Sequence, residues 1–226
     1  MSDPTIAVRV WDLPTRVFHW ILALCIFCSL TSAWLGGNAM VWHLRSGYLV
    51  FALLLFRLVW GFFGGRWSRF SSFAYTPATS LRYLRGQSRP EEHHHIGHNP
   101  LGAFSVFGLL AILSAQVASG LFADDEISTT GPLIKFVTAK TSSFLTHWHI
   151  RFGQWLIVAL VVLHVAAVLF YLVGRQHNLV RPMLSGDKTL SADVPPSIDT
   201  PGSRMLALAI FAAAAGLVTW LVRLGD

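Results

Sequence analysis

Histidines occur inside the most apolar parts of this sequence, where an ionisable side chain is costly to keep. His19, His43 and His164 lie within long apolar runs, and His147 and His149 stand at the start of the run that contains His164. A neutral imidazole in such a place can bind a metal ion or hydrogen-bond a neighbouring helix. Which of these it does depends on how the apolar runs arrange the histidines.

Five apolar runs are long enough to cross a membrane, because a hydrocarbon core about 30 Å thick needs roughly 20 helical residues. The chain is 54% hydrophobic and only 12% charged, a composition typical of integral membrane proteins. We therefore expect an all-α integral membrane protein of five transmembrane helices. The runs cover approximately residues 17–36, 42–63, 101–122, 150–173 and 204–223.

The charged residues between the runs predict the orientation of the chain. The stretch 64–97 is rich in arginine, whereas the loop after the third run opens with Asp124, Asp125 and Glu126. The positive-inside rule places the arginine-rich stretch and the N-terminus in the cytoplasm, and the acidic loop outside. The net charge of +6 is then a topological signal, and we expect no nucleic-acid binding. The first run lacks a small-residue cleavage site and is interpreted as a retained helix rather than a signal peptide.

Local signals refine the helix boundaries. Only a few residues around 36–38 separate the first two runs, so these helices should form an antiparallel hairpin. Asn99 suits the N-cap of the third helix and Pro100 its first turn. The segment 176–203, rich in Pro, Ser, Thr and Asp, is expected to be a cytoplasmic linker, and the run 204–223 an accessory helix without histidine.

The histidine spacing places the ligand candidates at two depths. His149 and His164 are 15 residues apart, which leaves about 60° of azimuth and ~22 Å along an α-helix axis, so one helix face can hold both. His147 lies about 100° away from His164 and is the poorer partner. By depth, His43 pairs with His149 near the outer surface, and His19 pairs with His164 nearer the cytoplasm. Facing imidazoles in a helix bundle are good axial ligands for haem iron, so two pairs predict two b haems.

Other roles are open to the same residue types. Each histidine alone could simply hydrogen-bond a carbonyl, but two depth-matched pairs favour haem. Cys25 and Cys28 are interpreted as buried filler, and covalent c-type haem is excluded because Ser29 rather than histidine follows Cys28. A closed zinc site is disfavoured, since no cysteine or carboxylate accompanies the histidines. The histidine tract 93–95 follows two glutamates in a basic loop and is expected to be solvated, with loop metal binding as the alternative.

Several motifs together resemble those of a known family, the bacterial cytochrome b561 proteins, which include nickel-iron hydrogenase b-type cytochrome subunits. The resemblance covers roughly residues 8–175 and implies a four-helix dihaem domain, to which the fifth helix is extra. The motifs are VWDLPTRVFHW at 10–20, WHLRSGY at 42–48 with RLVWGF at 57–62, GHNPLG at 97–102 and LHVA at 163–166.

The resemblance implies a membrane b-type cytochrome that carries electrons across the bilayer between an outer-face redox partner and quinone or another partner. The family's two fourth-helix ligands are usually 14 residues apart, whereas the spacing here is 15. His147, next to Trp148, is also a competing candidate for the outer ligand. Arg16 and Arg45 lie near helix ends, where a guanidinium could pair with haem propionates or simply reach the lipid headgroups. Arg57 lies deeper in its run and is a further candidate for the propionates.

No nucleophile, acid–base pair or phosphate-binding loop is recognisable, so we expect an electron-transfer subunit of a membrane oxidoreductase rather than a stand-alone enzyme. The expected partners are membrane lipid, a c-type cytochrome or hydrogenase-like subunit, and quinone as a further candidate. The expected location is the bacterial inner membrane, with several spans and a cytoplasmic N-terminus. The alternative function is a histidine-lined metal or proton permease without haem, which would be colourless when purified.

Overall fold

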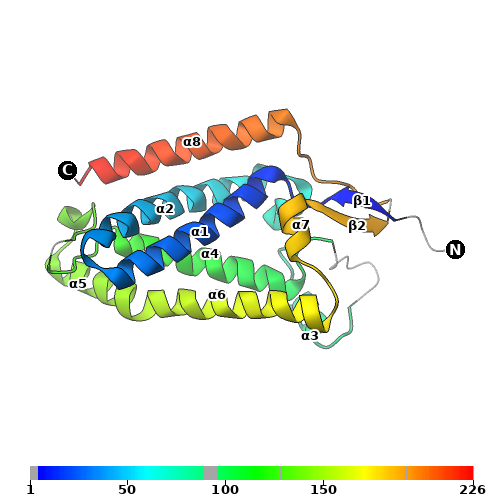
Figure 1. Ribbon diagram of the computed structural model, residues 1–226, viewed down its shortest axis with the longest axis horizontal. Helices are drawn as coiled ribbons and strands as arrows, with labels where there is room; N and C mark the ends of the chain where they lie inside the picture. Colours follow the sequence, from blue (N-terminus) through cyan, green and yellow to red (C-terminus); the bar gives the residue numbers. More distant parts are fainter. Residues whose placement is uncertain (1–4, 89–95, 128, 192, 226) are drawn as a thin grey trace. The chain divides into compact units, whose positions relative to one another are not determined.

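The computed structural model describes residues 5–88, 96–127, 129–191 and 193–225 (Figure 1). Five helical segments are long and apolar enough to cross a membrane, which confirms the predicted class of an all-α membrane protein. They are Leu13–Leu35, Gly37–Phe63, Pro100–Gly120, Ala139–Gly174 and Pro201–Arg223.

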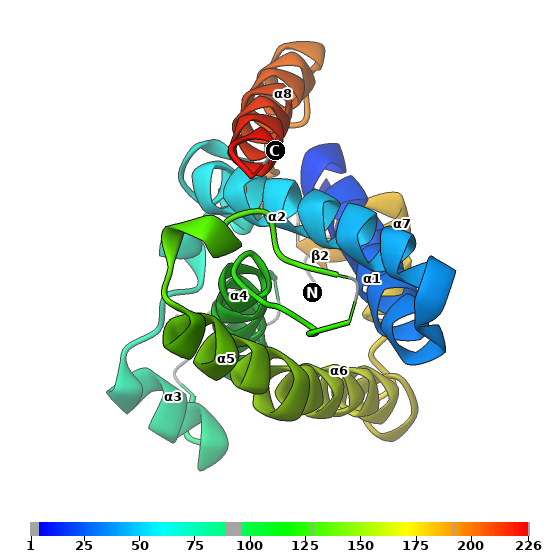
Figure 2. The same cartoon turned by 90° about the vertical axis from the view of Figure 1, so that its left-hand side faces the viewer.

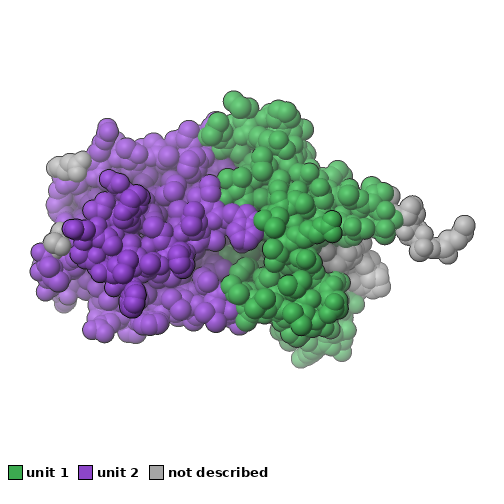
Figure 3. All heavy atoms as spheres, in the orientation of Figure 1, with its two compact units in different colours: residues 1–17, 57–107, 164–208 green, residues 18–56, 108–163, 209–226 purple. Residues whose placement is uncertain are grey.

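The chain forms two compact units, coloured separately in Figure 3, and each long helix contributes one segment to each unit. The histidine candidates are divided between the units, so each unit is described by itself. Unit 1 comprises residues 1–17, 57–107 and 164–208, and unit 2 comprises residues 18–56, 108–163 and 209–226.

Helices α1 (Leu13–Leu35) and α2 (Met40–Phe63) form the predicted hairpin. Helix α1 ends at Leu35. The next residue, Gly36, has a φ of 66° that is readily adopted only by glycine, and a short 3-10 turn, η1 (Gly37–Ala39), leads into α2. In unit 2 the ring of Phe18 packs against that of Phe56, with 6.2 Å between centroids. Contact between the start of one helix and the later part of the next is what an antiparallel pair requires.

Helix α4 (Pro100–Gly120) begins where the sequence predicts. The side-chain Oδ1 of Asn99 accepts a hydrogen bond of 2.8 Å from the backbone N–H of Gly102, and Pro100 occupies the first helical position. The N-cap prediction is confirmed.

The fourth span begins at Ala139 rather than near residue 150, so the expected start was wrong. The expectation followed hydropathy, and the first segment, α5 (Ala139–His147), is rich in Ser and Thr with one lysine. It is followed by a π-helical turn, η5 (Trp148–Gly153), by α6 (Gln154–Leu169) and by a second π-helical turn, η6 (Phe170–Gly174). His149 therefore lies within the span and inside a π turn, and the azimuth calculated for an unbroken α-helix does not hold.

Unit 1 contains the only sheet among the described residues. Strand β1 (Thr5–Arg9) pairs in antiparallel register with β2 (Asp187–Ser191), which follows α7 (Val180–Ser185). The segment 176–203 thus carries regular structure that the expectation of a linker did not include. A small apolar core supports the sheet and is formed by Val8, Val10, Trp11, Ile96, Leu190 and Val194.

The start of α1 is held in unit 1 by a buried carboxylate. Asp12 is 0% exposed, and its oxygens accept hydrogen bonds from Thr15 N, Trp60 Nε1, Gly65 N and Ser68 Oγ, at 2.8, 3.1, 3.1 and 2.6 Å. We call these five residues the Asp12 cluster. The 3-10 turns η2 (Arg66–Ser68) and η3 (Phe70–Ser72) follow α2 there, and the short helix α3 (Pro77–Leu84) comes after them.

In unit 2, segments of α1, α2, α4 and the fourth span lie around one another, and α8 (Pro201–Arg223) packs on α2 through Phe211 and Phe56, whose ring centroids are 6.3 Å apart. In Figure 2 the loop after α4, drawn in green, passes in front of the helices. That loop includes the 3-10 turn η4 (Ile134–Phe136).

Candidate functional site

Unit 2 encloses a cavity of about 490 Å³, which we call the histidine cavity. Its walls come from α1, α2, α4 and the fourth span, and the loop after α4 contributes Ala123, Ile127 and Gly131. This volume is within the range of about 300–1,000 Å³ that is usual for ligand and cofactor pockets. Most of the lining is apolar, as a site for a large aromatic cofactor requires.

His43 and His149 both line this cavity and lie beside each other. Their ring centroids are 5.9 Å apart and their planes are nearly perpendicular, at 87°. Imidazole is a common ligand of haem iron, and two rings this close together would be able to hold one iron between them.

The hydrogen bonds of both rings use the same nitrogen. Nδ1 of His43 lies 3.0 Å from the backbone oxygen of Ser29, and Nδ1 of His149 lies 2.9 Å from the backbone oxygen of Gln116. Because a carbonyl oxygen can only accept, each Nδ1 must carry the proton, and each Nε2 then has a lone pair. The chain therefore sets both imidazoles in the tautomer that ligates a metal through Nε2.

Two glycines make room at this site. A Cβ at Gly120 would lie 2.8 Å from Cε1 of His149, so a side chain there would displace the ring. Gly47, one turn after His43 on α2, lines the cavity, and a Cβ there would meet no atom within 4 Å. The space beside Gly47, the apolar walls and the two imidazoles with unprotonated Nε2 atoms together fit a b haem with two histidine ligands.

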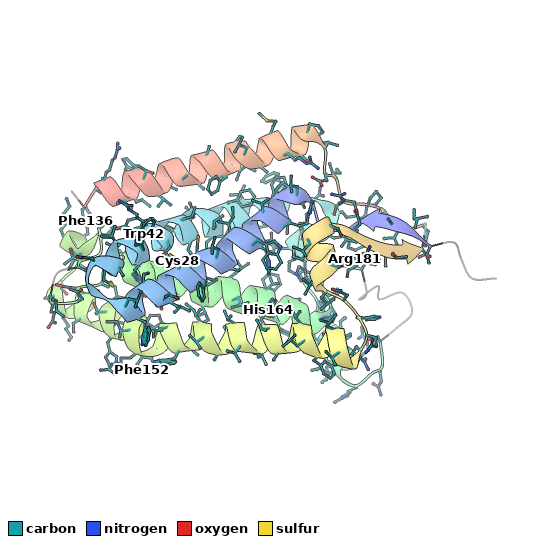
Figure 4. All side chains as sticks on the ribbon, in the orientation of Figure 1. Cys28, Trp42, Phe136, Phe152, His164 and Arg181 are labelled. Atoms are coloured by element: carbon teal, nitrogen blue, oxygen red, sulfur yellow. The ribbon has the colours of Figure 1, made fainter. Side chains whose placement is uncertain are left out.

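The remaining histidine candidates are placed elsewhere. His147 is exposed and packs on Phe152, with 5.4 Å between ring centroids, and it does not line the cavity. His19 belongs to unit 2 and packs edge-on against Trp20, at 5.1 Å. His164, labelled on α6 in Figure 4, belongs to unit 1. Because His19 and His164 lie in different units, their pairing stays a prediction.

Neither predicted propionate arginine lines the histidine cavity. Arg45 is exposed, with its guanidinium 5.4 Å from the ring centroid of Trp42. Arg16 donates a hydrogen bond to the backbone oxygen of Leu184 in unit 1. Arg57 is the buried arginine: it is 3% exposed, and its Nη2 donates to the backbone oxygen of Ser68 at 3.0 Å.

Metal sites other than haem are not indicated. Within the described ranges, no group of three or more His, Cys, Asp or Glu side chains could hold a metal ion. The histidine tract at 93–95, for which a solvated loop or loop metal binding was expected, lies outside the described residues. Cys25 is buried, as expected, and Cys28 is half-buried.

The sequence reasoning missed the polar residues that orient the two imidazoles. Ser29 Oγ lies 3.1 Å from Nδ1 of His43, and Ser119 Oγ lies 3.2 Å from Nδ1 of His149. Gln116 contacts His149 through both its backbone and its side chain. A signal was present, because Gln116 and Ser119 are polar residues near the end of a mostly apolar span.

Comparison with known proteins identifies the family. The family model described as prokaryotic cytochrome b561 matches residues 10–186, a stretch that includes His19, His43, His149 and His164. No solved structure matches the chain.

Curated relatives extend over most of the chain. The Escherichia coli K12 protein named probable Ni/Fe-hydrogenase 1 B-type cytochrome subunit is 23% identical over 82% of this chain and 92% of its own length. Proteins named probable Ni/Fe-hydrogenase B-type cytochrome subunit in Rhodobacter capsulatus and Cupriavidus necator are 26% and 28% identical. These alignments cover 83% and 81% of this chain, and 83% and 87% of the two relatives. Since the family model covers well over half of the sequence, the chain belongs to the prokaryotic cytochrome b561 family and is a multi-pass membrane b-type cytochrome of electron transfer.

Proposed function

We propose that this chain holds two b haems, one between His43 and His149 and the other between His19 and His164, and passes electrons between them across the membrane. The observation that carries the first site is the common hydrogen bonding of the two rings, in which each Nδ1 faces a backbone carbonyl beside the cavity. The second site is supported by the expected depth of its two histidines in the membrane. His19 lies near the start of α1, and His164 lies in the second half of α6. The Nδ1 of His164 lies 3.4 Å from Ser105 Oγ.

Haem supplies the one-electron redox chemistry when it is bound. The chain's own residues bind it, orient it and exclude water. The carbonyls of Ser29 and Gln116 fix the two imidazole planes and make the opposite ring nitrogens better donors to a metal. The apolar walls lower the local dielectric, which favours the less charged redox state of a buried centre.

We propose an inner-membrane location with a cytoplasmic N-terminus. Arginines concentrate in the stretch after α2, and acidic residues concentrate in the loop after α4, which supports this orientation. A reporter that is active only outside the cytoplasm should then be active when fused after Asp125 and silent when fused after Arg85. The opposite result would invert the topology.

The outer partner that we propose is a hydrogenase-like redox subunit, with a c-type cytochrome as the alternative and quinone as the acceptor or donor at the other side. The names of the relatives support the first choice. The loop after α4 lines the histidine cavity, so the His43–His149 site is the one beside the proposed outer face. A haem-free permease finds no support in the relatives, all of which are named as b-type cytochromes.

Pyridine haemochrome assay and redox titration of the purified protein test this proposal. Two extractable haems per chain are expected, and His43→Ala and His149→Ala should remove the same spectral component, because each variant removes one of the two imidazoles that would hold that haem. His147→Ala is the matched control and should keep both haems, since its side chain is exposed. A single haem per chain would contradict the dihaem assignment. Loss of haem from His147→Ala but not from His149→Ala would move the ligand to His147.

A further inference from the structure

Gln116 on α4 contacts His149 at two points. Its backbone oxygen accepts from Nδ1 of His149 at 2.9 Å, and its side-chain Nε2 donates to the backbone oxygen of His149, also at 2.9 Å. One residue therefore holds both the ring and the main chain of the ligand candidate. His43 differs, because its ring contacts Ser29 and its own backbone lies within the regular helix α2.

His149 also lies in the π turn η5, where its backbone oxygen accepts the N–H of Gln154, five residues further on. A π turn holds one residue more than an α turn. Inserting one residue rotates the helix before the insertion by about 100° relative to the helix after it. The π turn therefore decides which side chain of this segment faces His43.

The side chain of Gln116 reaches this turn because residue 153 is a glycine. A Cβ at Gly153 would overlap Oε1 of Gln116. That Oε1 is buried and has no hydrogen-bond partner among the described residues, which costs stability. An apolar side chain would avoid this cost, so packing alone does not account for an amide here. What the amide offers is a donor for the carbonyl of His149.

We propose that Gln116 is a positioning residue that holds the π turn and thereby the azimuth of His149 as a haem ligand. This inference rests on the proposed function, in which His43 and His149 share a haem. If the turn relaxed to a regular α-helix, a neighbour, Trp148 or Ile150, would take the azimuth of His149. Neither of these side chains can ligate haem iron, so the site would lose one axial ligand.

Gln116→Leu tests the proposal in the dihaem protein, with Gln87→Leu as the matched control. Gln87 is exposed and does not line the histidine cavity. Electron paramagnetic resonance of low-spin haem reports the ligand planes, and transfer to excess apomyoglobin reports haem release. Gln116→Leu should move one low-spin signal and speed the release of that haem by roughly 10–100-fold, the usual effect of removing a group that orients a metal ligand. The other haem, and both haems of Gln87→Leu, should behave as in the wild type.

Gly153→Ala provides an independent route to the same effect, because the added methyl group would displace the amide of Gln116. It should shift the same signal as Gln116→Leu. In a Gln116→Ala background, Gly153→Ala should cause no further shift, since the two substitutions act through one contact. Additive shifts would overturn the link between Gly153 and Gln116.

The outcomes separate this inference from the haem assignment. If the wild type is dihaem and His43→Ala removes one signal, but Gln116→Leu changes nothing, the positioning role fails and the haem assignment stands. If His43→Ala keeps both signals, the haem assignment itself fails. Loss of both haems together with helical circular dichroism in Gln116→Leu would also overturn the positioning role, because Gln116 would then support the whole fold.

Discussion

The Asp12 cluster of unit 1 and the histidine cavity of unit 2 both place polar side chains among apolar helices. The two regions differ in how far the chain itself supplies hydrogen-bond partners for these side chains. Asp12 is fully buried and accepts four hydrogen bonds from the protein itself. His43 and His149 each use Nδ1 for a carbonyl, and no hydrogen bond among the described residues uses Nε2 of either ring.

This difference in hydrogen bonding indicates a different role for each region. A buried polar group must find a partner or lower the stability of the fold. The Asp12 cluster joins the start of α1 to the end of α2 and the turn after it, so we infer that its role is to stabilise the fold. The histidine cavity is the site that we propose for a haem, so we expect its stability to depend on haem. Substitutions in the two regions should separate these roles.

The largest effect is expected from Asp12→Ala. The substitution leaves the donors of Thr15, Trp60, Gly65 and Ser68 without their acceptor, and hydrogen bonds to a charged group contribute about 1.5–3 kcal/mol each. We expect the free energy of unfolding to fall by at least about 3 kcal/mol, allowing for non-additivity. Thermal unfolding followed by circular dichroism in detergent measures it.

Asp193→Ala is the control for that experiment, because Asp193 is exposed. Its effect should stay within about 0.5 kcal/mol, as is usual for surface substitutions. Equal effects of the two variants would show that burial of Asp12 contributes nothing to stability.

Removal of haem should act on the other region. A ligand present at about 100–1,000 times its dissociation constant stabilises the folded state by about 3–4 kcal/mol. We therefore expect protein grown under haem limitation to exchange amide hydrogens faster in the segments that line the cavity, around 113–121 and 146–157. The segment of the Asp12 cluster around 60–68 should exchange as in the loaded protein. Uniform acceleration over both regions would show that they fold as one cooperative unit.

Several structural elements of the two regions could be predicted from the sequence, each for its own physical reason. Apolar run length predicts the spans, because the membrane fixes how long a helix must be. Local capping chemistry predicts the start of α4, since Asn99 acts on the backbone three residues away. The early start of the fourth span was missed because α5 is polar, and hydropathy reports burial in lipid rather than helix formation.

The π turn and the β1–β2 pairing could not be predicted from the sequence, for physical reasons. One extra residue in η5 leaves hydropathy unchanged, although it alters the azimuth of His149 by about 100°. The two strands pair residues about 180 positions apart, such as Arg9 with Asp187, and no local pattern predicts such a partner. For the site, residue type and depth indicated the histidines, whereas their orientation depends on Ser29 and Gln116 from other helices.

A smaller change in the free energy of unfolding is expected when one glycine is replaced by alanine in each of the two regions. A Cβ at Gly65 would lie 2.5 Å from Oδ2 of Asp12, so Gly65→Ala should lower the free energy of unfolding by about 1–3 kcal/mol, as overpacking usually does. Gly47 lies in a helix beside open space, so Gly47→Ala should be neutral or stabilising by up to about 1 kcal/mol in the haem-free protein.

The same two variants should also differ in the haem-loaded protein. Gly47→Ala places a methyl group in the cavity and should weaken haem binding at the His43–His149 site, whereas Gly65→Ala should leave the spectrum of the remaining folded protein unchanged. Redox titration of both variants measures this. Equal stability losses in the haem-free state would contradict the difference between the two regions.

A pH-dependent effect is expected at the edge of unit 1, where Lys188 on β2 donates a hydrogen bond of 2.7 Å to the backbone oxygen of Ile96. Burial lowers the pKa of Lys188 to about 8 from its usual value of 10.5. Between these two values the unfolded chain binds more protons than the folded one, so the fold gains stability as the pH rises through this window. We expect the melting temperature to rise by a few degrees between about pH 7 and pH 9.5, at ~2–4 °C per kcal/mol for a chain of this size. Lys188→Met should remove this rise without changing the haem spectrum, because Lys188 belongs to unit 1 and does not line the histidine cavity. An equal rise in the variant would assign the pH dependence to another group.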